Sequence, residues 1–259
     1  FPILNILRPD LFPSWWQYGH KFCGARKAPW GWEFKGATRL KELHSLLESE
    51  VMIRRRKEDV LDQLPAKRRH VVTLPLSDRR EYDAAHLDFI KWLSKNRPDK
   101  VGSAVKAEAL VRGGYLKRLA GKLKLPSVID WVNGFLEEDD GKLILFAHHI
   151  DVVETLHATW AKESVMVNGS VSMKKRRMAE DEFLKSKGKR IFVGNIRAAG
   201  VGWSAKGVST TAFAELDWTP GALQQAGDRT HGIGRGVKGE ASEEWWLVAK
   251  DTVEEKLVK

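Results

Sequence analysis

The chain has 259 residues, of which 42% are hydrophobic and 30% are charged, a composition typical of a folded protein and not of a disordered one. No run in it approaches the ~20 apolar residues that a membrane-spanning helix needs. A single cysteine, Cys23, excludes an internal disulfide and fits a reducing, intracellular setting. The formal net charge of +10 favours a polyanion. Since no predicted helix sets a basic face opposite a Trp/Leu face, nucleic acid is preferred to an anionic membrane.

Residues 1–36 are rich in Pro, Gly and Trp, which predicts an irregular segment with short helices. Four of the eleven tryptophans lie there, namely Trp15, Trp16, Trp30 and Trp32. Aromatic side chains among basic residues can stack on nucleic-acid bases, but we favour the interpretation that these tryptophans anchor the irregular segment.

Apolar side chains spaced three or four residues apart predict four helices in the region before residue 140. They are expected at 37–50, from Ser77 to beyond Leu93, at 104–122 and at 126–137. Ser77 is predicted to cap the second of them. A mainly helical region is therefore expected at 1–140.

From Gly141 onward, apolar runs alternate with helical segments, and this predicts βαβ units. The fold class is α/β, with a parallel sheet covered by helices on both faces. Strands are predicted at 143–147, 164–167, 190–194, 210–216 and 244–249, and helices at 150–162, 172–187 and 220–230. The α/β domain is expected to cover 141–259.

Ligands of open α/β sheets bind beyond the carboxyl ends of the strands, so the loops that follow the strands form the candidate site. These loops contain His148-His149, Asn168 and its neighbours, the run from Asn195 to Gly202, and Asp217. Small residues leave the backbone of the third loop uncovered, which suits the close approach of a phosphate. The alternative is that this loop is simply a turn between a strand and a helix, with no ligand.

Two arginines lie at the end of the last predicted helix, 220–230, and just beyond it. Arg229 is predicted on a helix leaving the sheet edge, and Arg235 on the turn after it. A guanidinium group can neutralise the charge that develops on a transferring phosphoryl group, whereas an arbitrary Asp-Arg pair would be a solvated helix end.

Four segments, in order and spacing, resemble the second RecA-like lobe of superfamily-two helicases, and in detail the Swi/Snf group. They are LILFAHH, VNGSVSMKKRRMAEDEF, IFVGNIRAAGVG and QQAGDRTHGIGR. Longer stretches, including MIRRRKEDVLDQLPAK and FAELDWTPGALQQAGDRTHGIG, are similar to the annealing-helicase (HepA-related) branch and argue against an RNA helicase. The resemblance covers nearly the whole chain. It implies a helical insertion or linker region between motor lobes at 1–140 and the second RecA-like lobe at 141–259.

The resemblance also implies roles for single residues. Nucleic-acid contacts are implied for His149, Asn168, Gly169, Ser170, Arg176, Asn195, Arg197, Arg54 and Arg55. Nucleotide contacts are implied for Gly200, Gly202, Gln225, Asp228 and Arg229. Arg229 matches the arginine finger, while the family's second arginine falls on Gly232, so either Arg235 replaces it or the motor has one finger fewer. The basic blocks 54–57 and 67–69 either contact DNA phosphates or the first lobe, or form a solvated linker.

For the whole protein, the resemblance implies an ATP-dependent double-stranded DNA translocase that remodels forks or chromatin. ATP and Mg²⁺ would be held mainly by a first lobe, because the chain contains neither G-x-x-x-x-G-K-[ST] nor Asp-Glu-x-His. We therefore expect a fragment that is inactive as an ATPase alone.

Its expected partners are DNA, with little sequence preference, and the first lobe of the same protein, with no membrane. The expected location is the cytoplasm or nucleoid of a bacterium or phage-infected cell, or a eukaryotic nucleus. The alternative is a stand-alone nucleic-acid-binding module derived from a helicase lobe.

Overall fold

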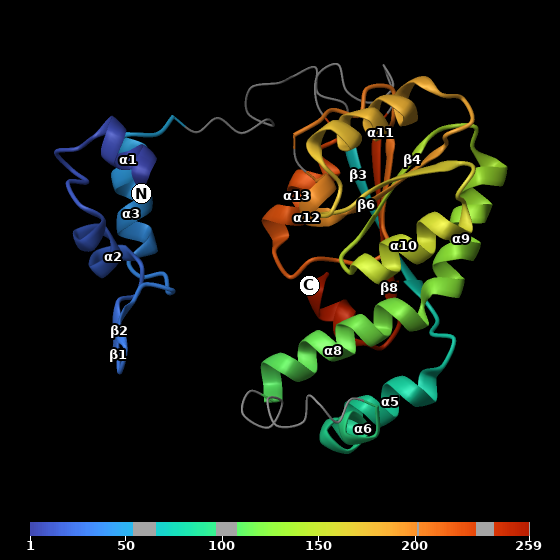
Figure 1. Cartoon of the computed structure of the whole chain (residues 1–259), viewed down its shortest axis with the longest axis horizontal. Coiled ribbons are helices and arrows are strands. Elements are labelled where there is room, and N and C mark those ends of the chain that lie inside the picture. Colours follow the sequence, from blue (N-terminus) through green and yellow to red (C-terminus); the bar gives the residue numbers. More distant parts are fainter. Residues whose placement is uncertain (54–65, 97–107, 201, 232–240, 259) are drawn as a thin grey trace. The chain divides into compact units, whose positions relative to one another are not determined.

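A computed structural model describes residues 1–53, 66–96, 108–200, 202–231 and 241–258 (Figure 1). The chain divides into two units, Phe1–Asp62 and Gln63–Lys259, which we call unit 1 and unit 2. The boundary predicted at residue 140 therefore lies inside unit 2. The reason is that residues 67–74 form a strand of the sheet of unit 2, and helices before residue 140 pack within the same unit.

Within its described residues, 1–53, unit 1 consists of three helices and a hairpin. The helices are α1 (Pro2–Leu7), α2 (Trp15–Phe22) and α3 (Leu40–Glu50), and the hairpin pairs β1 (Arg26–Ala28) with β2 (Gly31–Glu33). Ser14 caps α2 by accepting a hydrogen bond from the backbone amide of Gln17 at 3.3 Å. The short helices predicted here are present, but the hairpin was not predicted.

Unit 2 is built on a sheet of six strands within the described residues, in the order β3-β8-β7-β4-β6-β5. Every neighbouring pair is parallel. The strands are β3 (Lys67–Leu74), β4 (Leu143–Ala147), β5 (Ser164–Val167), β6 (Ile191–Asn195), β7 (Thr210–Phe213) and β8 (Ser242–Ala249). The predicted α/β class with a parallel sheet is confirmed.

The sheet is covered on both faces because alternate residues of each strand point to opposite sides. Leu143 and Leu145 of β4 pack with α9 (Leu125–Glu138) and α10 (Ile150–Thr159). Ile144 and Phe146 pack on the other side with α11 (Met173–Lys185), α12 (Ile196–Ala199) and α13 (Pro220–Gly227). These two helical layers flank the sheet in Figure 1.

Strand β3 is the strand of unit 2 that the sequence prediction missed. It begins with three cationic residues, so we assigned residues 67–69 to a basic block. In the structure Arg68 lies opposite Glu243, and Arg69 lies opposite Glu244 in β8. Arg69 Nε donates to Glu244 at 2.8 Å, and its guanidinium lies 4.1 Å from the ring centre of Trp246. The interpretation of residues 67–69 as a solvated linker is therefore wrong, because their charges are paired with Glu243 and Glu244 of the neighbouring strand β8.

Three further helices lie below the sheet in Figure 1: α5 (Arg79–Leu87), α6 (Phe89–Asn96) and α8 (Glu108–Leu123). The chain continues after β8 into the short 3-10 helix η2 (Val253–Leu257). Asp78, and not Ser77, caps α5 by accepting the amide of Glu81 at 3.0 Å. The single helix predicted to run past Leu93 is divided into α5 and α6. No helix among the described residues is long and apolar enough to cross a membrane.

Candidate nucleic-acid interface and nucleotide site

Three loops meet beyond the carboxyl ends of β7, β4 and β6, where fully buried Glu215 holds two of them together. Its carboxylate accepts hydrogen bonds from the backbone amides of His148 and His149 at 2.9 and 2.8 Å. The His149 ring also approaches Glu215, with Nδ1 2.7 Å from Oε1. Asn195 donates its side-chain amide to the His148 carbonyl at 2.6 Å. The predicted residues His149 and Asn195 are thus brought into one network. Strand β7 ends at Phe213, earlier than predicted, because Glu215 turns back to this loop.

A second buried carboxylate, Asp217, orients the predicted DNA-contacting residue Arg197. Arg197 Nε donates to Asp217 at 3.0 Å, and the backbone amide of Thr219 donates to it at 2.8 Å. Burial alone would raise the pKa of Asp217, but the hydrogen bonds from Arg197 and Thr219 hold it well below its ordinary value. The Arg197 side chain is nevertheless 66% exposed, so its guanidinium is fixed at one edge and open to solvent at the other.

Lys117 is a functional candidate that sequence reasoning missed. It projects from α8 and is 1% exposed, and its Nζ has no hydrogen-bond partner among the described residues. The Nζ atom lies 5.3 Å from the centre of the Trp218 ring. Burial lowers the pKa of Lys117, and the charges of Glu215 and Asp217 oppose that effect. A lysine in a basic helical stretch looks solvated from sequence alone, so no signal distinguished it.

The charge of Lys117 also affects the neighbouring imidazole. Burial and the nearby Lys117 ammonium lower the pKa of His148, which favours the neutral ring at neutral pH. Because the carboxylate of Asp217 can only accept, the hydrogen bond of 3.1 Å requires the proton on His148 Nδ1. The negative charges of Glu215 and Asp217 are thus opposed by the positive charges of Lys117 and Arg197. His148 and His149 orient the loop.

The next loop along the same edge follows β5, the strand beside β6. Asn168 is 5% exposed, and its Oδ1 accepts hydrogen bonds from the amide of Ser170 at 3.1 Å and from its hydroxyl at 2.7 Å. Asn168 therefore supports the turn, and it leaves Gly169 and Ser170 exposed. Arg176 in α11 pairs with Glu180 at 3.0 Å. The structure brings these residues to the same edge as Asn195, but it shows Asn168 acting on the turn itself.

The predicted nucleotide-contacting residues lie where the loop after α12 meets the end of α13. A Cβ on Gly200 would lie 2.2 Å from the Ile196 carbonyl oxygen, so only glycine allows this close turn. Gly202 is exposed and has a φ of +91°, and no heavy atom lies within 4 Å of the position its Cβ would take. The backbone here is bare on its outer side, as a phosphate contact requires.

Arg229 joins these two segments. One terminal nitrogen donates to the carbonyl of Trp203 at 2.6 Å, and Nε donates to the carbonyl of Gln225 at 3.0 Å. Arg229 was predicted to lie on a helix, but in the structure it follows the end of α13. Asp228 approaches Lys67 at 3.4 Å, at the amino end of β3. Arg54, Arg55 and Arg235 lie outside the described residues.

Two family models match the chain: an SNF2-related domain at residues 1–108 and a helicase conserved C-terminal domain at 124–234. The chain belongs to the SNF2-related helicase family. It is 35% identical over 258 residues to the SWI/SNF-related matrix-associated actin-dependent regulator of chromatin subfamily A-like protein 1 of Xenopus tropicalis, a match over 98% of this chain and 26% of that protein. It is 32% identical over 244 residues to the human DNA annealing helicase and endonuclease ZRANB3, a match over 91% of this chain and 22% of that protein.

These relatives confirm the predicted resemblance to the annealing-helicase branch of the family. This SNF2-related chain spans about a quarter of their length. The crystal structure of the C-terminal part of the Fun30 ATPase domain superposes with a TM-score of 0.60 and 14% identity, over 75% of this chain and 89% of that one. This similarity confirms the fold.

Proposed function

We propose that this chain is the C-terminal half of an ATP-dependent double-stranded DNA translocase that remodels forks or chromatin. The observation that carries the proposal is the position of α13. The helix begins at Pro220, directly after Thr219, whose amide donates to Asp217 in the candidate DNA site. It ends just before Arg229 in the candidate nucleotide site. A helix of eight residues is about 12 Å long, so one short rigid element connects the two sites. The relatives, which include a DNA annealing helicase, support the same function.

ATP would supply the phosphoryl group, and Arg229 would neutralise charge developing on it once a first lobe closes. The bare backbone at Gly200 and Gly202 fits a phosphate on this side, with Gln225 and Asp228 nearby. Among the described residues, no group of three or more His, Cys, Asp or Glu side chains is arranged to hold a metal ion. The family resemblance implies that Mg²⁺ would be held mainly by the first lobe. Within the family, this chain would act in a nucleus or nucleoid.

The isolated 259-residue chain is expected to hydrolyse ATP no faster than background, with or without DNA. The reason is that it contains no G-x-x-x-x-G-K-[ST] segment to hold the phosphates. Phosphate release from the purified chain measures this, and the full-length protein serves as the positive control. Turnover that is stimulated by DNA in the isolated chain would contradict the assignment. If the full-length protein is also inactive but binds DNA, the chain is a stand-alone binding module.

DNA binding by the chain is expected to weaken with salt and to depend little on base sequence. Arg197→Ala should lower the slope of log affinity against log salt by about 0.9 for one lost phosphate contact on duplex DNA. Arg68→Ala is a matched control, because Arg68 is 65% exposed and ion-paired with Glu243 but lies near the amino end of β3. Fluorescence anisotropy at several salt concentrations measures both. Equal slopes for the two variants would exclude Arg197 as a contact.

A further inference from the structure

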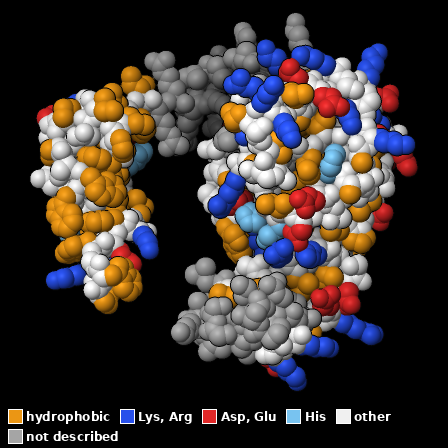
Figure 2. Space-filling model, in the orientation of Figure 1, with side chains coloured by type: hydrophobic (Ala, Val, Ile, Leu, Met, Phe, Trp, Pro, Cys, Tyr) orange, Lys and Arg blue, Asp and Glu red, His pale blue; other side chains and the backbone are white. Residues whose placement is uncertain are grey.

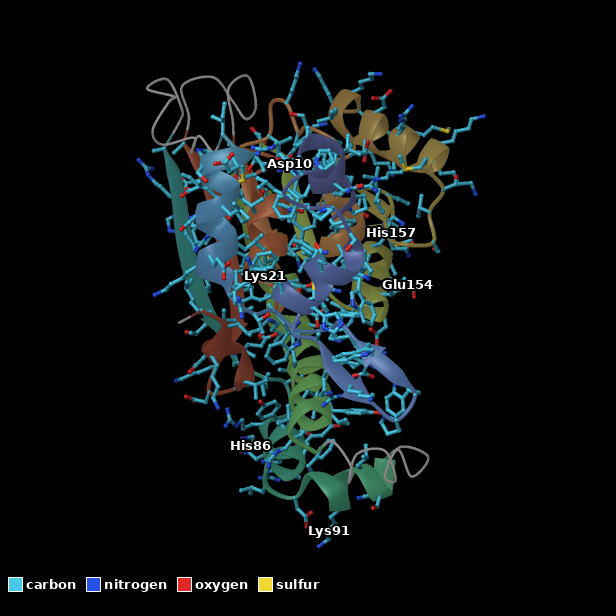
Figure 3. The ribbon with its side chains drawn as sticks, turned by 90° about the vertical axis from the view of Figure 1, so that its left-hand side faces the viewer. Asp10, Lys21, His86, Lys91, Glu154 and His157 are labelled. Carbon is cyan, nitrogen blue, oxygen red and sulfur yellow. The ribbon has the colours of Figure 1, made fainter. Side chains whose placement is uncertain are left out.

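The hairpin of unit 1 carries an aromatic side chain at its tip. Strands β1 and β2 pair from Arg26↔Glu33 to Ala28↔Gly31, so Pro29 and Trp30 form the two-residue turn. The φ of +126° at Gly31 explains why glycine follows the turn. The hairpin extends away from the helices of its unit (Figures 1 and 3), and Trp30 is 77% exposed.

The other tryptophan of the hairpin has a different environment. Trp32 packs against α2, with its ring centre 4.3 Å from that of His20 and 6.0 Å from that of Trp16. Phe34 extends the same contact, 5.6 Å from Trp16. These rings fix the hairpin on α2. The anchoring role predicted for the tryptophans therefore holds for Trp16 and Trp32 but does not explain Trp30.

Trp30 has no ring partner among the described residues, but it is oriented. Its indole N–H donates to Glu33 at 3.2 Å, and Glu33 is also paired with Arg26 at 2.9 Å. The ring is thus held by one edge while most of its surface is in water. The exposed face of the ring is therefore available to a ligand.

The hairpin itself carries an excess of basic side chains. Residues 26–35 contain Arg26, Lys27 and Lys35 and one acidic residue, Glu33. Arg26 and Lys35 are 75% and 85% exposed. Hydrophobic side chains also cover much of the visible face of unit 1 (Figure 2). Arg26 and Lys35 are both ion-paired with Glu33, so one carboxylate serves two exposed cations. A nucleic-acid strand offers a base to the aromatic ring and phosphates to these cations together.

We propose that Trp30 stacks on an unpaired base at a junction between single-stranded and duplex DNA, with Arg26, Lys27 and Lys35 on the flanking phosphates. An unpaired base is required because paired bases within a duplex present their edges in the grooves, while their faces are stacked. The inference rests on the proposed DNA-binding function, and it adds a structure preference that phosphate contacts along the sheet edge would not give.

The test compares the 259-residue chain with Trp30→Ala on a forked DNA and on a blunt duplex of equal charge, by fluorescence anisotropy. On the fork, Trp30→Ala should weaken binding by about fivefold or more, since base stacking on an aromatic ring has an effect of this size. On the blunt duplex, the change should stay within about twofold. Trp30→Phe keeps an aromatic face and should retain most of the fork preference. Leu40→Ala, which removes a 61% exposed apolar side chain from the same unit, should change neither affinity.

A 2-aminopurine base at the fork junction reports stacking directly, through fluorescence quenching that Trp30→Ala should abolish. Equal losses on fork and duplex, or no loss on either, would overturn the inference while leaving the proposed function intact. If Leu40→Ala lowers fork affinity as much as Trp30→Ala, the surface is apolar and unspecific, and the inference is again wrong. A wild-type chain that binds neither DNA would instead contradict the proposed function.

Discussion

Replacing Arg229 by alanine in the full-length protein is expected to reduce DNA-stimulated ATP hydrolysis by about 10³–10⁵-fold, the range seen for arginine fingers. The two hydrogen bonds to the carbonyls of Trp203 and Gln225 hold the guanidinium at the corner where α13 ends. A side chain fixed before the lobes close needs little reorganisation during the reaction, which is why its loss should be large. DNA affinity should be unchanged, because the residues of the sheet edge are untouched.

Arg229 also contributes to the fold, so the design must separate the two roles. Loss of its hydrogen bonds to carbonyls should lower the free energy of unfolding by about 1–3 kcal/mol. Thermal unfolding of each variant measures this part. Arg229→Lys keeps the charge without the planar fork, and a rate near that of Arg229→Ala would show that the fork is required.

Arg235 decides whether the motor has a second finger. A large rate loss in Arg235→Ala would show that this arginine replaces the one missing at Gly232, and no loss would show a single finger. If Arg229→Ala retains turnover within about twofold at saturating DNA, the finger assignment is wrong, since a finger accounts for much larger factors.

Glu254→Gln is expected to lower the free energy of unfolding by about 3–5 kcal/mol, because it leaves the buried charge of Lys124 uncompensated. Both side chains are 0% exposed. Lys124 Nζ contacts Glu254 and donates to the Leu247 carbonyl at 2.6 Å, and Glu254 accepts the amide of Ala249 at 2.9 Å. The pair therefore connects the start of α9 to β8 and η2. Chemical denaturation of the 259-residue chain measures the change.

The double variant Lys124→Met with Glu254→Gln removes both charges and should cost less than Glu254→Gln alone. A matched surface control is Asp83→Asn, whose partner Arg79 lies one helical turn away with both side chains nearly half exposed. That change should cost under about 1 kcal/mol. If Glu254→Gln costs no more than Asp83→Asn, the buried pair is not a major source of stability.

Much of unit 2 could be predicted from sequence because its central strands are buried on both faces. Runs such as LILFA at β4 cannot be confused with solvated segments, and their loops follow at fixed positions. Strand β3 could not be predicted, because its cations are neutralised by glutamates that are distant in sequence. Lys117 was missed for a similar reason, since Glu215 and Asp217, whose charges oppose the effect of its burial, are distant from it in sequence.

The candidate site was predicted less evenly. The residues at the sheet edge were found because the loop after each strand can be read from the strand itself. The contact of Arg229 with Trp203 depends on how the loop after α12 folds onto α13, and no spacing rule gives that. The hairpin was missed because its strands are three residues each, too short for an alternating pattern to be recognised.

The parallel pairing of β3 with β8 has a consequence for how unit 2 assembles. The register runs from Lys67↔Ser242 to Leu74↔Ala249, so one border of the sheet closes between segments near opposite ends of the unit. During synthesis β3 emerges early and stays without its neighbour until almost the whole unit has left the ribosome. Contacts of such high sequence separation slow folding, because the intervening chain must be ordered first. The exposed strand is protected in the meantime by the repulsion between its cations, which discourages pairing with a second copy. The cations that made the start of β3 look like a basic linker would therefore keep the nascent chain from aggregating.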